Sequence, residues 1–203
     1  MKQKLEILRS RCVPLPVDNI DTDQIIPARY LKATTREESF FGEHLFQDWR
    51  YRADGTPNPD FVLNDPRYSG QILLGGRNFG SGSSREHAAW AIAGHGFRAV
   101  VASSFADIHK QNELNNFVLP VTVDQEFLDA LVALVKAHPE TDVEINLPKE
   151  TISVVGHPEM SRKFPINAYK KHCFLNGLDD IDYLLTCRPL VEEWEKTHHT
   201  AQA

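Results

Sequence analysis

The amino-acid sequence predicts an α/β protein whose sheet is at least partly parallel. Three short apolar runs have the length and composition of buried strands, and the two segments between them have the spacing of helices. In chain order, these elements are a strand at 71–74, a helix at 88–93, a strand at 98–102, a helix at 107–116 and a strand at 118–123. Strands that alternate with helices in this way are typical of a partly parallel sheet.

The segments that precede this region are less regular. Residues 5–17 alternate apolar and polar side chains and contain two prolines, which predicts one strand that ends in a turn. Residues 37–49 carry apolar and aromatic side chains at helical spacing. We therefore expect one amphipathic helix there, with its aromatic side chains in the core or at a partner interface. Glycine and proline predict a loop at 54–59.

The C-terminal part of the chain has clearer patterns. Asp124 is expected to cap a long helix, because apolar residues follow it at helical spacing. Two alternating segments joined by a short turn predict a hairpin. The expected elements are a helix at 125–138, strands at 142–147 and 151–155, helices at 166–175 and 179–194 on either side of Gly177, and a loose tail at 197–203.

Composition bounds the size and class of the protein. The chain has 203 residues, 41% of them hydrophobic, which suits one domain over 1–203 that buries roughly 70% of its unfolded surface. A net charge of −6 and a pI near 5.8 argue against a nucleic-acid-binding surface. No apolar run approaches the ~20 residues of a membrane span, and the first ten residues contain no signal-peptide core. We expect a cytoplasmic protein.

The cysteines and histidines do not form a metal-binding pattern. Cys12, Cys173 and Cys187 are odd in number and lack Cys-x-x-Cys spacing, so neither a disulfide framework nor a zinc site is expected. His87 and His95 stand eight residues apart, and no His-Glu-x-x-His motif occurs. We therefore expect this chain to hold no metal ion.

The most distinctive stretch is a loop rich in glycine and serine at 75–87. It contains four glycines and three serines within ten residues, between a predicted strand and a predicted helix. Such a loop leaves backbone N–H groups free at the start of the helix, where the helix dipole also favours negative charge. With the guanidinium of Arg85 alongside, the loop is a candidate site for a carboxylate or phosphate.

Three interpretations of this loop compete. Ser83 followed three residues later by Glu86 matches a capping box, in which both side chains only satisfy helix N–H groups. A dinucleotide site is disfavoured because Arg85 stands where the fingerprint requires its third glycine, and no Walker Gly-Lys-Ser/Thr follows. The third interpretation is catalytic, with a serine oxygen held among N–H groups beside an arginine.

A cluster of carboxylates precedes the loop by about sixty residues. Asp18, Asp21 and Asp23 do not form a calcium loop, because glycine and glutamate are missing from the required positions. For Asp18 and Asp21 we expect the ordinary role of capping turns by bonding nearby backbone.

Residues 78–89, Asn-Phe-Gly-Ser-Gly-Ser-Ser-Arg-Glu-His-Ala-Ala, resemble the serine-arginine signature of the swivelling domain of aconitase-type hydro-lyases. Residues 18–31 and 104–112 resemble two further motifs of that family, in the expected order and spacing. The resemblance covers about residues 5–195. Together with the length of the chain, it is similar to the separate small subunits of the isopropylmalate isomerase branch.

The resemblance implies a fold and a division of the chain. The fold is a three-layer ββα swivelling domain of aconitase type, with a barrel-like mixed sheet. Residues 34–70 are implied to form a substrate-specificity insert, and 165–203 a C-terminal helical extension and tail.

The resemblance also implies an activity and a partner. The activity is that of a hydro-lyase in leucine biosynthesis, which interconverts 2-isopropylmalate and 3-isopropylmalate by dehydration and rehydration through isopropylmaleate. The implied partner is a large subunit whose cysteines hold a [4Fe-4S] cluster, so no cofactor is expected on this chain. The implied substrate is a small dicarboxylate.

Roles transfer to the matching positions of the motifs. Ser83 is implied to be the base, Ser84 to assist it, and Asp23 to be an active-site carboxylate. The substrate-binding residues implied are Arg85, Gly82 and Arg36.

Two alternatives remain open from the sequence. One is the small subunit of a sister hydro-lyase that acts on citraconate, 2-methylmalate or homoaconitate. The other is a non-catalytic anion-binding module, in which residues 80–85 bind a phosphate and nothing more.

Overall fold

The fold is centred on a parallel sheet of four short strands in the order β2-β3-β4-β5. The computed structural model describes residues 2–33 and 37–198. The strands of the parallel sheet are β2 (Cys12–Pro14), β3 (Ile72–Leu74), β4 (Ala99–Ala102) and β5 (Leu119–Thr122). Almost all of their side chains are buried, as expected for a sheet that is covered on both faces. The predicted strands at 71–74, 98–102 and 118–123 are thus confirmed.

A second sheet is antiparallel and has the order β1-β6-β7-β8. Its strands are β1 (Ile7–Ser10), β6 (Val143–Asn146), β7 (Thr151–Val154) and β8 (His157–Lys163). The predicted hairpin is confirmed as β6 and β7, whereas β8 was not predicted. The single strand expected at 5–17 is wrong, because the chain breaks at Arg11 and passes from the antiparallel to the parallel sheet.

The helices agree with most of the predicted positions. They are α1 (Thr22–Ile25), α2 (Glu38–Glu43), α3 (Gln47–Arg50), α4 (Glu86–His95), α5 (Asp107–Asn115), α6 (Gln125–Ala137), α7 (Ala168–Asn176) and α8 (Asp180–His198), with 3-10 turns at Ala28–Lys32 and Val62–Asn64. Asp124 caps α6 as predicted, accepting a hydrogen bond of 2.8 Å from the N–H of Phe127. Gly177 ends α7 at φ 67°. The loose tail expected from 197 is wrong at its start, since α8 runs to His198.

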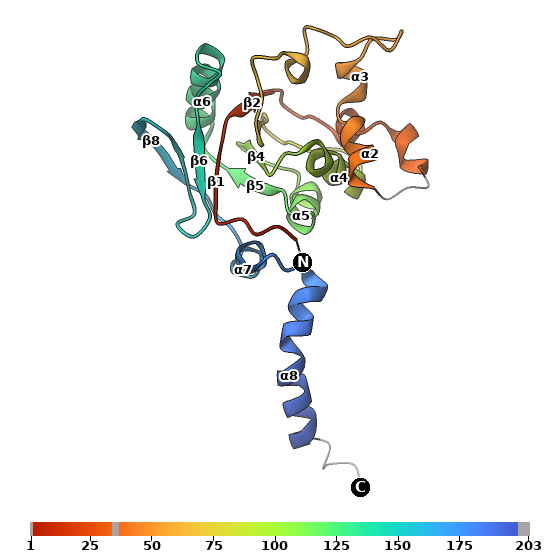
Figure 1. Cartoon of the computed structure of the whole chain (residues 1–203), viewed down its shortest axis with the longest axis vertical. Helices are drawn as coiled ribbons and strands as arrows, with labels where there is room; N and C mark the ends of the chain where they lie inside the picture. Colours follow the sequence, from red (N-terminus) through yellow and green to blue (C-terminus); the bar gives the residue numbers. More distant parts are fainter. Residues whose placement is uncertain (1, 34–36, 199–203) are drawn as a thin grey trace.

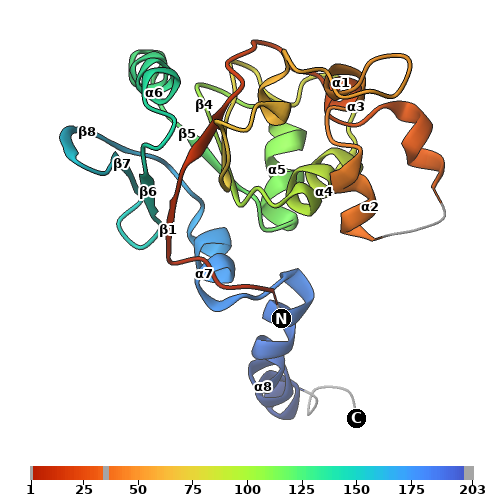
Figure 2. The same cartoon turned by 45° about the horizontal axis from the view of Figure 1, so that its top comes forward.

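The two sheets and the helices form three layers (Figure 2). Because side chains alternate along a strand, β2, β3 and β4 each contribute to two cores. Val13, Leu73 and Val100 point into a cluster with residues of α1, α2 and α4. The neighbouring residues of the same strands point to the other face and join a second cluster with α6 and the antiparallel sheet. This cluster includes Cys12, Ile72, Leu74, Ala99, Val101, Leu131, Val143, Ile145 and Ile152.

The predicted α/β class and its ββα layering are therefore confirmed. The sheet itself is simpler than the barrel-like mixed sheet that was expected. Among the described residues, the strands divide into one parallel and one antiparallel sheet, and no closed barrel is formed.

The single helix predicted at 37–49 is divided in two. The chain leaves the helical conformation at His44 and passes through Phe46, whose φ of 50° is left-handed. Phe46 is fully buried, and its N–H donates a 2.8 Å hydrogen bond to the carbonyl of Ile25. This tertiary contact overrides the helical spacing of the sequence. The prediction that the aromatic side chains contribute to the core is confirmed by Phe41 and Phe46.

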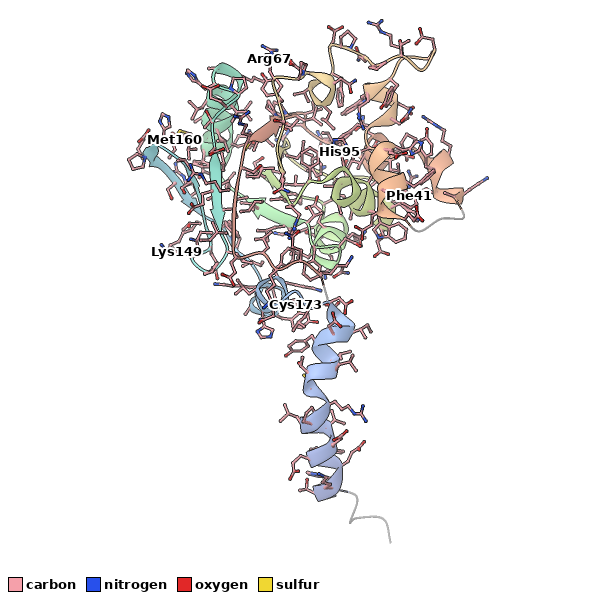
Figure 3. All side chains as sticks on the ribbon, in the orientation of Figure 1. Phe41, Arg67, His95, Lys149, Met160 and Cys173 are labelled. Carbon is pink, nitrogen blue, oxygen red and sulfur yellow. The ribbon has the colours of Figure 1, made fainter. Side chains whose placement is uncertain are left out.

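Helices α2 and α4 cross at two glycines. A Cβ atom added to Gly94 would lie 1.8 Å from the carbonyl oxygen of Glu38, and one added to Gly42 would lie 2.2 Å from the carbonyl carbon of Gly94. Phe41 packs against Trp90 with ring centroids 5.3 Å apart. Figure 3 labels Phe41 on α2 and His95 at the end of α4. The backbones of the two helices are therefore in direct contact.

Gly94→Ala should lower the free energy of unfolding by about 1–3 kcal/mol, because the new methyl group overpacks this crossing. Equilibrium urea unfolding measures the loss, and hydrogen exchange should show reduced protection of the α2 amides. The control is Gly55→Ala, where an added Cβ meets nothing within 4 Å and the cost is limited to the strain of alanine at a φ of 82° in its own turn. It should leave the protection of α2 unchanged; equal protection of α2 in both variants would contradict the predicted contact.

Candidate active site

Three loops meet at the carboxyl edge of the parallel sheet. Because β2, β3 and β4 run in the same direction, the segments that follow them leave the sheet at one edge. These segments are 15–21 before α1, 75–85 before α4, and 103–106 before α5. They carry the three motifs on which the family resemblance depends.

The central loop is hydrogen-bonded to the loop before α1. The N–H groups of Gly80 and Ser81 both donate to the carbonyl of Ile20, at 2.8 and 3.0 Å. Thr22 donates two hydrogen bonds to the central loop. Its N–H donates to the carbonyl of Ser81 at 2.9 Å, and its hydroxyl donates to the carbonyl of Ser83 at 2.8 Å. These bonds fix the backbone on both sides of Gly82.

The central loop is also bonded to the loop before α5. The N–H of Phe79 donates to the carbonyl of Ser104 at 3.0 Å, and the N–H of Ala106 donates to the carbonyl of Phe79 at 2.9 Å. The N–H of Asn78 donates to the hydroxyl of Ser104 at 2.8 Å. The glycine-rich loop is thus held between its two neighbours by backbone hydrogen bonds.

A buried histidine lies directly against the loop. Gly80 has a φ of 75°, and a Cβ added there would lie 2.0 Å from Cδ2 of His109. Nε2 of His109 is 2.9 Å from Oε1 of Glu113, one turn along α5, and both side chains are at most 1% exposed. Burial raises the pKa of Glu113. His109 therefore supports the backbone of the loop at Gly80.

Ser83 does not cap α4. The helix begins at Glu86, its N-cap is Arg85 in an extended conformation, and no side chain accepts a hydrogen bond from its first turn. Glu86 instead accepts a 3.3 Å hydrogen bond from the side chain of Asn116. The capping-box interpretation is therefore wrong, because Arg85, and not Ser83, holds the N-cap position of α4.

Ser83 and Ser84 are exposed at the rim of a pocket of about 260 Å³. Within the described part of the chain, neither serine hydroxyl has a hydrogen-bond partner. Gly82 lies beside them with a φ of 88°. The pocket is lined by Thr22, Gly80, Gly82, Ser83, Ser84, Arg85, Ala106, Asp107, Ile108 and His109.

Arg85 and Asp23 form an ion pair at this edge. Nη1 of Arg85 contacts Oδ1 of Asp23, and the arginine side chain is 16% exposed whereas the carboxylate is 52% exposed. The pair joins the first turn of α1 to the N-cap of α4. A guanidinium at the end of a helix dipole provides the positive potential that an anion requires.

The other aspartates of the cluster have structural roles. Asp21 caps α1 as predicted, since its side chain accepts a 2.8 Å hydrogen bond from the N–H of Gln24. Asp18 does not bond its own turn; it accepts a 2.7 Å hydrogen bond from the N–H of Arg77 in the central loop.

The sequence interpretation selected four of the ten residues that line the pocket, namely Gly82, Ser83, Ser84 and Arg85. Five of the six predicted site residues lie at this edge, and the sixth, Arg36, lies outside the described residues. Thr22 was not selected, although its hydroxyl holds the backbone of Ser83. Its place between Asp21 and Asp23 in a family motif was the available signal.

The described residues do not suit a metal ion or an iron–sulfur cluster. No group of three or more His, Cys, Asp or Glu side chains converges anywhere in 2–33 and 37–198. Cys12 lies in the parallel sheet and Cys173 in α7, both buried, whereas Cys187 lies in α8. In the same residues, no helix combines the length and apolar character needed to cross a membrane.

Comparison with known proteins identifies the family. The model of the aconitase C-terminal domain matches residues 2–126. A 3-isopropylmalate dehydratase small subunit from Cytophaga hutchinsonii is 53% identical over 195 residues, which are 96% of each chain. One from Chloroflexus aurantiacus is 48% identical over 197 residues, covering 97% of this chain and 96% of the relative.

A solved structure gives the same result. The 3-isopropylmalate dehydratase of Methanocaldococcus jannaschii aligns with a TM-score of 0.64 and 27% identity, covering 93% of this chain and 99% of the other. Similarity of this extent is accompanied here by the serine-arginine loop at the carboxyl edge of the sheet. The chain belongs to the aconitase C-terminal domain family, among the 3-isopropylmalate dehydratase small subunits.

Proposed function

We propose that this chain is the small subunit of a 3-isopropylmalate dehydratase, a hydro-lyase of leucine biosynthesis. The observation that carries the proposal is the similarity to relatives of that name over nearly the full length, for example at 53% identity over 96% of both chains. The reaction removes water from 2-isopropylmalate and adds it back to isopropylmaleate at the neighbouring carbon, which gives 3-isopropylmalate. We assign it to the cytoplasm.

The chemical task of this chain is to remove and return a proton on a carbon beside a carboxylate. We assign that task to Ser83. A serine hydroxyl is a poor base because its pKa lies far above neutrality, so the alkoxide must be stabilised by nearby positive charge. The N-terminus of α4 and the guanidinium of Arg85 supply that stabilisation. The uncapped helix end leaves its N–H groups free for this purpose.

The neighbouring residues bind the substrate and orient it. Arg85 takes a substrate carboxylate through two parallel hydrogen bonds, and Asp23 holds the guanidinium from the other side. Gly82 lets the carboxylate approach the backbone, because it has no side chain at that point. Ser84 assists Ser83 from the same rim of the pocket.

The rest of the active site is assigned to a large subunit. The metal-binding side chains of residues 2–33 and 37–198 are not grouped in a way that suits a cluster. We therefore propose that the [4Fe-4S] cluster belongs to the partner, and that this chain forms the facing wall around the dicarboxylate. Residues 34–70, including Arg36, select the substrate side chain, and 1–203 act as one swivelling domain whose extension begins near 165.

The proposal is tested by measuring turnover of 3-isopropylmalate with this chain alone, with an anaerobically reconstituted large subunit alone, and with both. Activity is expected only in the mixture. If a verified complex with an intact cluster turns over citraconate or homoaconitate instead, the chain belongs to a sister enzyme. If the two chains do not associate, the anion-binding alternative takes its place.

Ser83→Ala should lower kcat by roughly 10²–10⁴-fold, because that is the usual contribution of a general base. The free energy of unfolding should change by less than about 0.5 kcal/mol, since the side chain is exposed and makes no hydrogen bond. Steady-state kinetics of the complex and urea unfolding of this chain measure the two effects.

Ser81→Ala is the matched control for Ser83. Its hydroxyl donates to the carbonyl of Asn19 at 3.2 Å and lies outside the pocket lining. Its removal should destabilise the loop by about 1 kcal/mol and leave kcat within a few-fold of the original. Near-normal turnover of the Ser83 variant would falsify its role as the base.

Arg85→Lys should raise KM roughly 10–100-fold, because lysine keeps the charge but not the planar pair of donors. The matched control is Arg77→Lys, on the same loop, whose exposed guanidinium pairs with Asp18 at 3.4 Å. That variant should keep KM within about twofold. Equal KM values in the two variants would contradict the assigned role of Arg85.

A further inference from the structure

Helix α8 exposes a large apolar surface. It has 19 residues, none of them buried, and it extends away from the remainder of the molecule (Figures 1 and 2). Six of the ten large apolar side chains that are exposed in the described part of the chain belong to it. They are Ile181, Leu184, Leu185, Leu190, Val191 and Trp194, with 52% to 73% exposure. An apolar surface of this size marks an interaction site.

Three of these apolar side chains align along one side of the helix. Leu184, Val191 and Trp194 follow the spacing of seven and three residues that aligns side chains along a helix. Glu193 and Lys196 lie on the opposite side and form only a weak ion pair at 3.9 Å. Tyr169 and His172 of α7 contact Tyr183 at the base of the helix. Figure 3 shows the rest of α8 extending away from the other elements. Leu184, Val191 and Trp194 therefore form an apolar face that is exposed in the described part of the chain.

The base of α8 is fixed to the molecule. Lys170 of α7 is 7% exposed, and its ammonium donates to Oδ1 of Asp180 at 2.6 Å and to the side chain of Asn115 at 2.9 Å. The hydroxyl of Tyr169 donates to the same oxygen of Asp180 at 2.9 Å, and the Tyr169 ring packs edge-on against Tyr183. The Lys170 ammonium lowers the pKa of Asp180. The helix thus projects in a direction set by α5 and α7.

The charges of α8 favour a different chain over a second copy. The helix carries five carboxylates, at 180, 182, 192, 193 and 195, against one arginine and one lysine. Arg188 is already paired with Glu192 at 2.8 Å. Two copies of this helix would bring like charges together, which opposes association. Glu195 borders the face of Leu184, Val191 and Trp194, so a groove that receives this face should have a basic rim.

We propose that α8 is a docking arm that binds the large subunit in an apolar groove with a basic rim. This inference rests on the proposed function, which requires such a partner. Helix α5 connects the two regions, because His109 near its start lines the pocket and Asn115 at its end contacts Lys170. The arm therefore begins roughly 10 Å along α5 from the pocket. It can hold the partner without taking part in the chemistry.

The test is a triple variant, Leu184→Gln, Val191→Gln and Trp194→Gln, which keeps helix-forming side chains but removes the apolar face. Sedimentation velocity and activity titration with the reconstituted large subunit should give a Kd at least about tenfold higher. At saturating large subunit, kcat should be unchanged, because the pocket is untouched. Glu195→Lys alone should also raise Kd severalfold by repelling the basic rim.

The matched control is Glu193→Gln with Lys196→Gln, on the opposite side of the same helix, and it should keep Kd within about twofold. An unchanged Kd in the triple variant overturns the docking arm. A dimer of the unaltered small subunit that the triple variant abolishes, with binding of the large subunit intact, would assign the face to a second copy. A tight complex of the unaltered chains without turnover would instead overturn the proposed function and leave the docking result standing.

Discussion

The parallel pairing of β2, β3 and β4 is the constraint on which the site depends. Its three crossovers deliver loops from distant parts of the sequence to one edge, where backbone hydrogen bonds join them. The strands have only three or four residues each, so backbone hydrogen bonds alone stabilise each strand pair only slightly. Burial on both faces compensates, since each of these three strands contributes to two apolar clusters. The same arrangement leaves the carboxyl edge open to a ligand.

The glycine-rich loop contains residues with many accessible backbone conformations, but the folded protein holds it in one of them. Gly80 is required because the ring of His109 occupies the space of its Cβ, and Gly82 because its backbone is left-handed. Once those conformations are adopted, bonds to Ile20 and Ser104 prevent the loop from relaxing. The exposed serines therefore lie on a fixed support. Preorganised donors of this kind need no rearrangement when negative charge develops.

The sequence predicts most elements of the parallel half because short apolar strands and a strongly amphipathic helix such as α6 are determined locally. It does not predict the break at Phe46, where a buried ring and a tertiary hydrogen bond override helical spacing. Nor does it predict β8, whose alternating exposure is hidden by charged side chains. At the site, the motif identifies Ser83 and Arg85, but only the extended backbone at Arg85 distinguishes an exposed serine from a helix cap.

The glycine crossing of α2 and α4 has a mechanical consequence. Because the two backbones are in direct contact, we expect the helices to move as one unit. Arg85 is the N-cap of α4, and α2 begins at Glu38. Under the proposed role of Arg85, any shift of α4 on binding of a carboxylate would therefore displace α2 as well.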